Sequence, residues 1–339
     1  METRRSTETS PSATAPVPSS PSLRSRLALT AGRYGVRPIN CLLPANPLGI
    51  AAARGLVASI MAICGPVLPG TRVTHVRSGS LRGEWVCAAG VGHGDRALYY
   101  VHGSGYVICS ARTHRGLASR LSRATGLPVF VVEYRLAPEH PFPAAADDVA
   151  EGYRWLLAHG YRAGDLVIGG DSAGGHLCVD LLLDNARTGV AQPAGAVLFS
   201  PLIDLSFELA RGCELRAAEA MASARTGRNA VRLYTGDEPE DSPRLRLRIP
   251  AGIALPPLFV QVSGAEMLAD DAHHLRDLAH AAGVPCELEV WPGQIHVFQA
   301  LPLAVPEAAA ALRRAAAFIT GVLARSRAAQ PVSSAREAG

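Results

Sequence analysis

The sequence predicts one α/β domain built on a mostly parallel β-sheet with helices on both faces. The 339 residues are 48% hydrophobic, enough for one large core. From Arg72 onward, short apolar runs rich in β-branched residues alternate with helical runs. A Gly-rich turn also joins one apolar run directly to a helix within residues 166–187. Such alternation is typical of parallel strands connected by crossover helices.

The expected strands and helices follow one another along the chain. Strands are expected at residues 98–101, 129–134, 166–169, 196–200, 258–262 and 287–291. Helices are expected at residues 113–124, 144–159, 173–187, 270–282 and 306–323. Gly189 and Gly283 stand where two of these helices should end.

Two segments interrupt the alternation. Residues 31–70 have a helical pattern before the first strand of the alternation, and residues 205–250 form an Arg-rich insertion between two strands. Both are expected to cover a pocket on a domain spanning residues 31–325. Residues 1–30 are rich in Ser, Thr, Pro and Ala without the apolar core of a signal peptide, so they are expected to be a disordered leader. Residues 326–339 are expected to be a disordered tail.

Composition excludes several classes of partner. The net charge is only +4, with part of the excess in arginines near the chain ends, so no nucleic-acid partner is predicted. The seven cysteines are an odd number and form no CxxC motif, which disfavours a disulfide framework. The protein is therefore expected in the reducing cytoplasm. The most apolar helical stretch, residues 55–64, is about half of the ~20 residues that cross a bilayer, so no membrane span is predicted.

The segment GDSAGG at residues 170–175 carries the strongest chemical signal. A bare GxSxG occurs by chance in about one chain in ten of this length. Here it lies between an expected strand and an expected helix, where flanking glycines let the backbone turn sharply and lift the Ser172 hydroxyl clear of the sheet. This context favours Ser172 as a nucleophile over an idle serine in a Gly-rich turn.

A second Gly-rich loop, HGSG at residues 102–105, follows the expected strand at 98–101. Small residues there allow backbone N–H groups to approach a developing oxyanion. One strand–helix–strand unit separates this loop from the turn at Ser172. Together they form half of an acyl-transfer site.

At this point the sequence resembles the hormone-sensitive-lipase-like (family IV) bacterial carboxylesterases of the α/β-hydrolase superfamily. HGSG at 102–105, YRLAPE at 134–139, the GDSAGG turn and the late His296 carry the resemblance, which runs from about Arg72 to the last helix. It implies an α/β-hydrolase fold with an eight-stranded sheet, a helical cap and a Ser/acid/His triad. The family roles fall on Ser172 as nucleophile, on His296 as base, and on the backbone amides of Ser104, Gly105 and Ala173 as oxyanion donors.

The sequence departs from the family at two positions. Ser104 replaces the middle glycine of the usual HGGG loop, which predicts a narrower oxyanion hole or a shifted loop. Residues 264–268, GAEML, stand where the family has a Gly-x-Asp-Pro-Leu-like segment, so Glu266 takes the place of the acid.

Reasoning from the residues alone also requires an acid just after the expected strand at 258–262, where α/β sheets gather catalytic side chains. Glu266 meets this requirement. Asp270 and Asp271 remain alternatives, although both could be first-turn acids favoured by a helix dipole.

The remaining polar residues have plainer interpretations. His296 lies in the loop after the last expected strand, whereas His102 is expected to be a structural hydrogen-bonding residue. Arg135 and Glu139 are expected to pair with each other, and Asp147 and Asp148 to start a helix. No metal and no cofactor are predicted.

The predicted function is hydrolysis of short- to medium-chain carboxylic esters by a serine carboxylesterase that forms an acyl-enzyme. A small-molecule ester is the expected partner, and a sheet edge could pair in a homodimer. The sequence leaves open acyl transfer, amide hydrolysis or dehydration at the same site. It also leaves open a non-catalytic small-molecule receptor on the same fold, which would be expected to lack a triad member.

Overall fold

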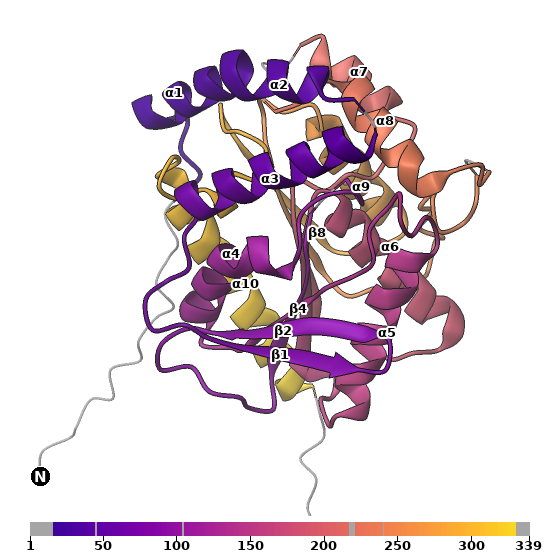
Figure 1. Cartoon of the computed structure of the whole chain (residues 1–339). Helices are drawn as coiled ribbons and strands as arrows, with labels where there is room; N and C mark the ends of the chain where they lie inside the picture. The colour runs from indigo at the N-terminus through magenta and orange to yellow at the C-terminus, as the bar shows by residue number, and fades with distance from the viewer. Residues whose placement is uncertain (1–15, 45, 104, 217–220, 240, 330–339) are drawn as a thin grey trace, which may run out of the picture.

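The computed structural model describes residues 16–329 except 45, 104, 217–220 and 240 (Figure 1). A single sheet holds eight strands in the order β1-β2-β4-β3-β5-β6-β7-β8. The strands are β1 (Arg72–Ser78), β2 (Leu81–Cys87), β3 (Ala97–Val101), β4 (Val129–Val132), β5 (Leu166–Asp171), β6 (Gly195–Phe199), β7 (Leu258–Ser263) and β8 (Cys286–Trp291). β1 and β2 are antiparallel, and β3 to β8 are parallel to one another.

The described α-helices are α1 (Leu23–Ala31), α2 (Arg37–Leu42), α3 (Pro47–Cys64), α4 (Ala111–Thr125), α5 (Ala144–Ala158), α6 (Ala173–Thr188), α7 (Glu208–Glu214), α8 (Ala224–Thr235), α9 (Ala269–Ala281) and α10 (Glu307–Ala328). A π-helical turn, Gly32–Val36, joins α1 to α2. Every strand and helix expected between residues 98 and 323 is present, with ends that differ by a few residues. Gly189 and Gly283, both with positive φ, follow α6 and α9 as expected.

Two hydrophobic layers cover the sheet. α5, α6 and α9 pack on one face and α4 and α10 on the other. Alternate side chains of β3 point into the two layers, Tyr99 into the first and Leu98 and Tyr100 into the second. Burial on both faces explains why these strands are continuous apolar runs in the sequence.

The N-terminal leader is shorter than predicted. Residues 23–30, assigned to a disordered leader, belong to α1. Its start is fixed by Glu307 at the beginning of α10, which accepts hydrogen bonds from the Ser22 backbone N–H and the Ser25 hydroxyl, each at 2.6 Å. α10 likewise runs past residue 325 to Ala328. Residues 1–15 and 330–339 lie outside the described residues.

The apolar helix near residue 60 is longer than predicted. α3 spans Pro47–Cys64, 18 residues with mean hydropathy 1.7, whereas the sequence indicated an apolar stretch of residues 55–64. Among the described residues it is the one helix whose length and composition would suffice to cross a membrane, and only 11% of it is buried. Asn46 caps its first turn by accepting from the Gly49 N–H, and Pro47 occupies the first helical position, a placement that proline favours.

Candidate active site

Ser172 stands on a strained turn between β5 and α6. Its φ of 52° and ψ of −122° lie outside the regions that ordinary residues favour. Hydrogen bonds hold the turn on both sides: the Ser172 N–H donates to the Phe199 carbonyl at 2.9 Å, and the Ser172 carbonyl accepts from Leu202 at 3.0 Å. The sequence-predicted position of Ser172 at a sharp strand-to-helix turn is confirmed.

The glycines around Ser172 are required by close approach. A Cβ on Gly174 would lie 2.2 Å from the Val101 carbonyl oxygen. A Cβ on Gly175 would lie 2.7 Å from the Pro201 Cβ. Both distances are shorter than atoms tolerate, so the helix after Ser172 packs against its neighbours only without side chains at these positions.

His296 and Glu266 come together at the carboxyl end of the sheet. His296 Nδ1 lies 2.6 Å from Glu266 Oε2. The Glu266 side chain is 1% exposed, whereas that of His296 is 24% exposed. A buried carboxylate at this distance fixes the orientation of the ring, favours a proton on Nδ1 and leaves Nε2 as the acceptor nitrogen.

Ser263, at the end of β7, ties the two loops together. Its N–H donates to Glu266 Oε1 at 3.0 Å. Its hydroxyl donates to the Gln294 carbonyl at 2.7 Å and accepts from the N–H groups of Ala265 and Gln294. The loop that carries the carboxylate and the loop that carries the imidazole are therefore joined through one buried serine, which the sequence analysis did not single out.

The two aspartates considered as alternatives have other partners. Asp270 forms an ion pair with Arg216 at 2.5 Å on the surface. Asp271 is fully buried, and its Oδ1 accepts from the N–H groups of Ile203 and Asp204, both at 2.8 Å. Burial raises the pKa of Asp271 to about 7 despite these two hydrogen bonds.

Of the predicted oxyanion donors, Gly105 and Ala173 are described, and Ser104 lies outside the described residues. Gly105 has φ of 54° and lines the same cavity as Ser172 and His296. Ala173 is the first residue of α6, where backbone N–H groups are free of intrahelical partners.

A buried polar network lies behind these groups. Asp171 Oδ1 accepts from the Tyr100 hydroxyl at 2.8 Å, and Asp171 Oδ2 lies 3.3 Å from His114 Nε2. Burial alone would raise the pKa of Asp171, but His114, Tyr100 and the Gly103 N–H together hold it below its ordinary value. This carboxylate therefore links the Ser172 turn to the loop at 102–105, a role that the sequence analysis missed.

His102 is a structural residue, as predicted. It is fully buried and stacks on Tyr134 with ring centroids 4.2 Å apart. Burial lowers its pKa to about 3, with a smaller contribution from His114. The Tyr134 hydroxyl donates to the His102 carbonyl at 2.7 Å, which fixes the start of the loop.

The predicted pairing of Arg135 with Glu139 is wrong. Arg135 binds Asp148 of α5 at 2.8 Å, and Glu139 binds Arg54 of α3 at 2.8 Å. Asp148 lies 13 residues from Arg135, and Arg54 lies 85 residues from Glu139, so neither pair follows from local spacing. Glu139 therefore fixes the cap to the body of the domain.

Among the described residues, no three His, Cys, Asp or Glu side chains cluster as metal ligands would.

A cavity of about 460 Å³ opens over Ser172 and His296. Its lining comes from both cap segments as well as from the sheet edge, with α3 contributing Ile50, Val57 and Met61. Phe207 and Leu233 contribute from the second segment. An apolar cavity over a nucleophile and a base suits a small, largely apolar substrate.

Comparisons with known proteins agree with this geometry. A sequence profile described as the alpha/beta hydrolase fold matches residues 98–300. The carboxylesterase/phospholipase LipF of Mycobacterium tuberculosis is 34% identical over 320 residues, which cover 89% of this chain and 82% of that protein. An acetyl-hydrolase of Streptomyces hygroscopicus is 38% identical over 257 residues, covering 75% and 83% of the two chains.

The solved structures give the same result. A crystal structure of an esterase from the bacterial hormone-sensitive lipase family has a TM-score of 0.80 and 34% identity, covering 89% of this chain and 99% of that one. The profile, the relatives and the structures confirm both the predicted fold and the resemblance. The chain therefore belongs to the α/β-hydrolase family and, within it, to the hormone-sensitive-lipase-like bacterial esterases.

Proposed function

We propose that the protein is a serine carboxylesterase that hydrolyses short- to medium-chain esters through an acyl-enzyme, with Ser172, Glu266 and His296 as its triad. One observation carries the proposal. A strained Ser172 and a His296 oriented by buried Glu266, 2.6 Å away, share one apolar cavity. Relatives named as esterases and carboxylesterases support the reaction class.

In the proposed reaction, His296 Nε2 takes the Ser172 hydroxyl proton as the serine oxygen attacks the ester carbonyl. Glu266 holds the ring and stabilises its positive form. The imidazolium then gives its proton to the departing alcohol, leaving an acyl-enzyme. A water molecule, activated by His296, releases the acid and restores the serine.

The tetrahedral intermediates carry negative charge on the former carbonyl oxygen. We assign the backbone N–H groups of Ser104, Gly105 and Ala173 as its donors. Each such donor typically contributes about 10²- to 10³-fold in rate. Asp171, through its hydrogen bond with the Gly103 N–H, supports the loop that presents two of them.

Residues 31–70 and 205–250 act as the cap in this proposal, and the cap residues that line the cavity set the acyl-chain length. The cavity of about 460 Å³ is large enough for a short or medium acyl chain together with an alcohol group. Its apolar lining from α3 and the second segment favours alkyl groups over charged ones.

The proposal also includes a homodimer and a cytoplasmic location. β8 is an edge strand whose Val290 is exposed, and two such edges could pair between copies. All seven cysteines are free, which suits a reducing compartment. Sedimentation velocity of wild type beside a Val290→Lys variant tests the dimer, which the charged edge should disrupt.

The test of the function uses purified wild type and Ser172→Ala. Wild type should hydrolyse 4-nitrophenyl butyrate and react with a fluorophosphonate probe at Ser172. The variant should stay folded, resist the probe and lose activity by about 10⁴-fold or more. Labelling at a different serine, or a folded variant that keeps most of the rate, would refute the assignment.

A further inference from the structure

Large exposed apolar side chains are concentrated on the N-terminal part of the cap. Of the large hydrophobic residues exposed in the described structure, all but one lie on α1 to α3 or directly beside them. They are Leu23, Leu27, Tyr34, Ile39, Leu42, Leu48, Ile63, Val67, Leu215 and Leu303, and the exception is Val290 on β8. Figure 1 shows α1, α2 and α3 together on one side of the molecule. We call these ten residues the cap face.

Hydrogen bonds and an ion pair place the last two members beside the helices. Leu303 donates its N–H to the Cys64 carbonyl at 3.0 Å and accepts from the Arg24 guanidinium. Glu214, next to Leu215, pairs with Arg37 of α2. The ten residues of the cap face therefore lie on neighbouring elements and are not scattered singly over the molecule, a pattern that alone would need no explanation.

The helices that carry most of the cap face, α1 to α3, hold positive charge and no carboxylate. Between residues 9 and 83 the sequence contains no Asp or Glu, whereas α1 to α3 and their connections carry Arg24, Arg26, Arg33, Arg37 and Arg54. Arg37 and Arg54 form ion pairs. Among the described residues, no ion pair involves Arg26 or Arg33, both of which are exposed. Arginine next to exposed leucine and tyrosine is the composition of surfaces that bind anionic lipid.

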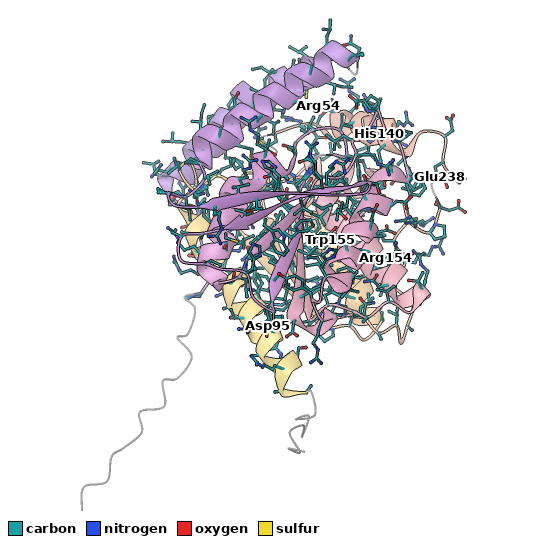
Figure 2. All side chains as sticks on the ribbon, turned by 60° about the horizontal axis from the view of Figure 1, so that its bottom comes forward. Arg54, Asp95, His140, Arg154, Trp155 and Glu238 are labelled. Carbon is teal, nitrogen blue, oxygen red and sulfur yellow. The ribbon has the colours of Figure 1, made fainter. Side chains whose placement is uncertain are left out.

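α3 is held against the body of the domain, so on a membrane it would lie along the bilayer surface and would not span the bilayer. Arg54, in the middle of the helix, binds Glu139 and donates to the carbonyls of Val107 and Ala137. Figure 2 shows Arg54 between the N-terminal helices and the rest of the molecule. One side of α3 lines the cavity over Ser172, and its Leu48 and Ile63 point outward at 83% and 71% exposure.

We infer that the cap face binds the surface of an anionic phospholipid bilayer, with α1 to α3 lying flat in the headgroup region. The inference goes beyond ester hydrolysis and concerns where the protein acts. The apolar side chains would enter the outer edge of the acyl region, and Arg26 and Arg33 would bind headgroup phosphates. Because α3 also lines the cavity, bound protein would hold that cavity beside esters dissolved in the membrane.

A second copy of the chain fits this face less well. A two-fold dimer brings the same patch of each subunit together. Arg26 and Arg33 would then meet α1 to α3 of the other copy, which contain no carboxylate, while Glu208 and Glu214 of the neighbouring α7 are already paired with Arg228 and Arg37. Like charges placed together oppose association, whereas a bilayer supplies the opposite charge.

The experiment measures binding of the full chain to vesicles by sedimentation. Vesicles contain phosphatidylcholine alone or with about one third phosphatidylglycerol. Wild type should sediment with the anionic vesicles, bind neutral vesicles at least about 10-fold more weakly, and be partly released by salt. Arg26→Glu/Arg33→Glu should weaken anionic binding by about 50-fold or more. Leu42→Ser/Leu48→Ser/Ile63→Ser should weaken it by about 10-fold or more.

The matched charge control is Arg325→Glu/Arg327→Glu on α10. Both arginines are exposed, and they lie about 27 and 30 Å along the helix from the end that contacts α1. This variant makes the same change in net charge and should bind like wild type. Equal weakening by both double variants would mean that net charge alone attracts the protein, and would overturn the assignment of the cap face.

Activity on dissolved 4-nitrophenyl butyrate separates the two proposals. Every cap-face variant replaces residues outside the cavity lining, so each should keep the wild-type rate on this substrate. If wild type hydrolyses the ester but does not bind anionic vesicles, the membrane inference is refuted and the esterase proposal is unaffected. A wild-type dimer that the triple serine variant converts to monomer, with no vesicle binding, would show that the occupant is a second copy.

Discussion

The carboxyl edge of the sheet and the N-terminal part of the cap differ in how their side chains are held. Around Ser172, buried polar groups are fixed by several hydrogen bonds each, as in Ser263 and Asp171. On the cap, Leu42 and Leu48 are more than four-fifths exposed. Catalysis requires fixed distances, whereas a surface that meets substrate or lipid needs only the right composition. Substitutions should therefore affect chemistry in the first region, and in the second they should affect selectivity where the residue lines the cavity and surface binding where it does not.

The largest effect after loss of Ser172 should come from Glu266. Glu266→Gln replaces the carboxylate 2.6 Å from His296 Nδ1 with an amide that can hold the wrong tautomer and supplies no counter-charge. We expect kcat to fall by up to about 10⁴-fold. Glu266→Asp should lose only part of the activity, because its shorter side chain lengthens the hydrogen bond. Steady-state kinetics on 4-nitrophenyl butyrate measure both, and a nearly normal Glu266→Gln would remove this residue from the triad.

Asp171 tests whether the hydrogen-bond network behind Ser172 also holds catalytic groups at fixed distances. Asp171→Asn keeps the shape but removes the charge that His114, Tyr100 and the Gly103 N–H stabilise. The loop at 102–105 should then be held less well, and kcat should fall by about 10-fold or more with little change in KM. A fall in thermal stability with unchanged kcat would show that the network serves only folding.

The same division explains how much the sequence could predict. β3 to β8 and helices α4, α5, α6, α9 and α10 form local apolar runs with clear starts and ends, and all were predicted, whereas α7 and α8 lie in the insertion at 205–250 and were not predicted as separate helices. β1 and β2 were not predicted from the residue pattern. β1 is an edge strand with mostly exposed side chains, and in β2 the residues Arg82, Gly83 and Glu84 interrupt the apolar run. The triad candidates follow from order along the strands, since parallel strands end at one edge.

Contacts between distant segments were the part that could not be predicted. α1 is ordered by Glu307, 285 residues from Ser22, and nothing near residue 23 indicates this. In the same way, Glu139 pairs with Arg54, 85 residues away, and not with the expected Arg135. The position of Ser263 between two loops depends on the packing of β7 beside β8. Asn46 and Pro47 are a local start signal for α3, which lies outside the predicted apolar stretch of residues 55–64.

The cap should control chain length more than rate. Val57 of α3 lines the cavity, and Val57→Phe should fill part of it. We expect the ratio of kcat/KM for octanoate to that for butyrate to fall by about 10-fold, with butyrate turnover changed far less. Ala62→Phe, an exposed position on the same helix outside the lining, is the matched control. An equal change in both variants would place chain-length selection elsewhere.

The smallest effect on rate, and the clearest contrast with Glu266, should come from Asp271. Asp271→Asn keeps an oxygen that can accept from Ile203 and Asp204, so activity should stay within about two-fold of wild type. Its effect should appear in stability. Burial raises the pKa of Asp271 to about 7, whereas an unfolded aspartate titrates near 3.9.

The sign of the pH dependence follows from these two pKa values. A raised folded pKa means that the folded state binds the proton more tightly, so this contribution to stability is complete below about pH 4 and is lost as the pH rises through 7. Asparagine cannot ionise, so the free energy of unfolding of the variant relative to wild type should rise by a few kcal/mol between pH 4 and 8, at most about 1.4 kcal/mol per pH unit. Urea unfolding at several pH values measures the difference. A constant difference across this range would mean that folding does not raise the pKa of Asp271. A crippled Asp271→Asn beside a normal Glu266→Gln would mean that Asp271 is the carboxylate serving His296.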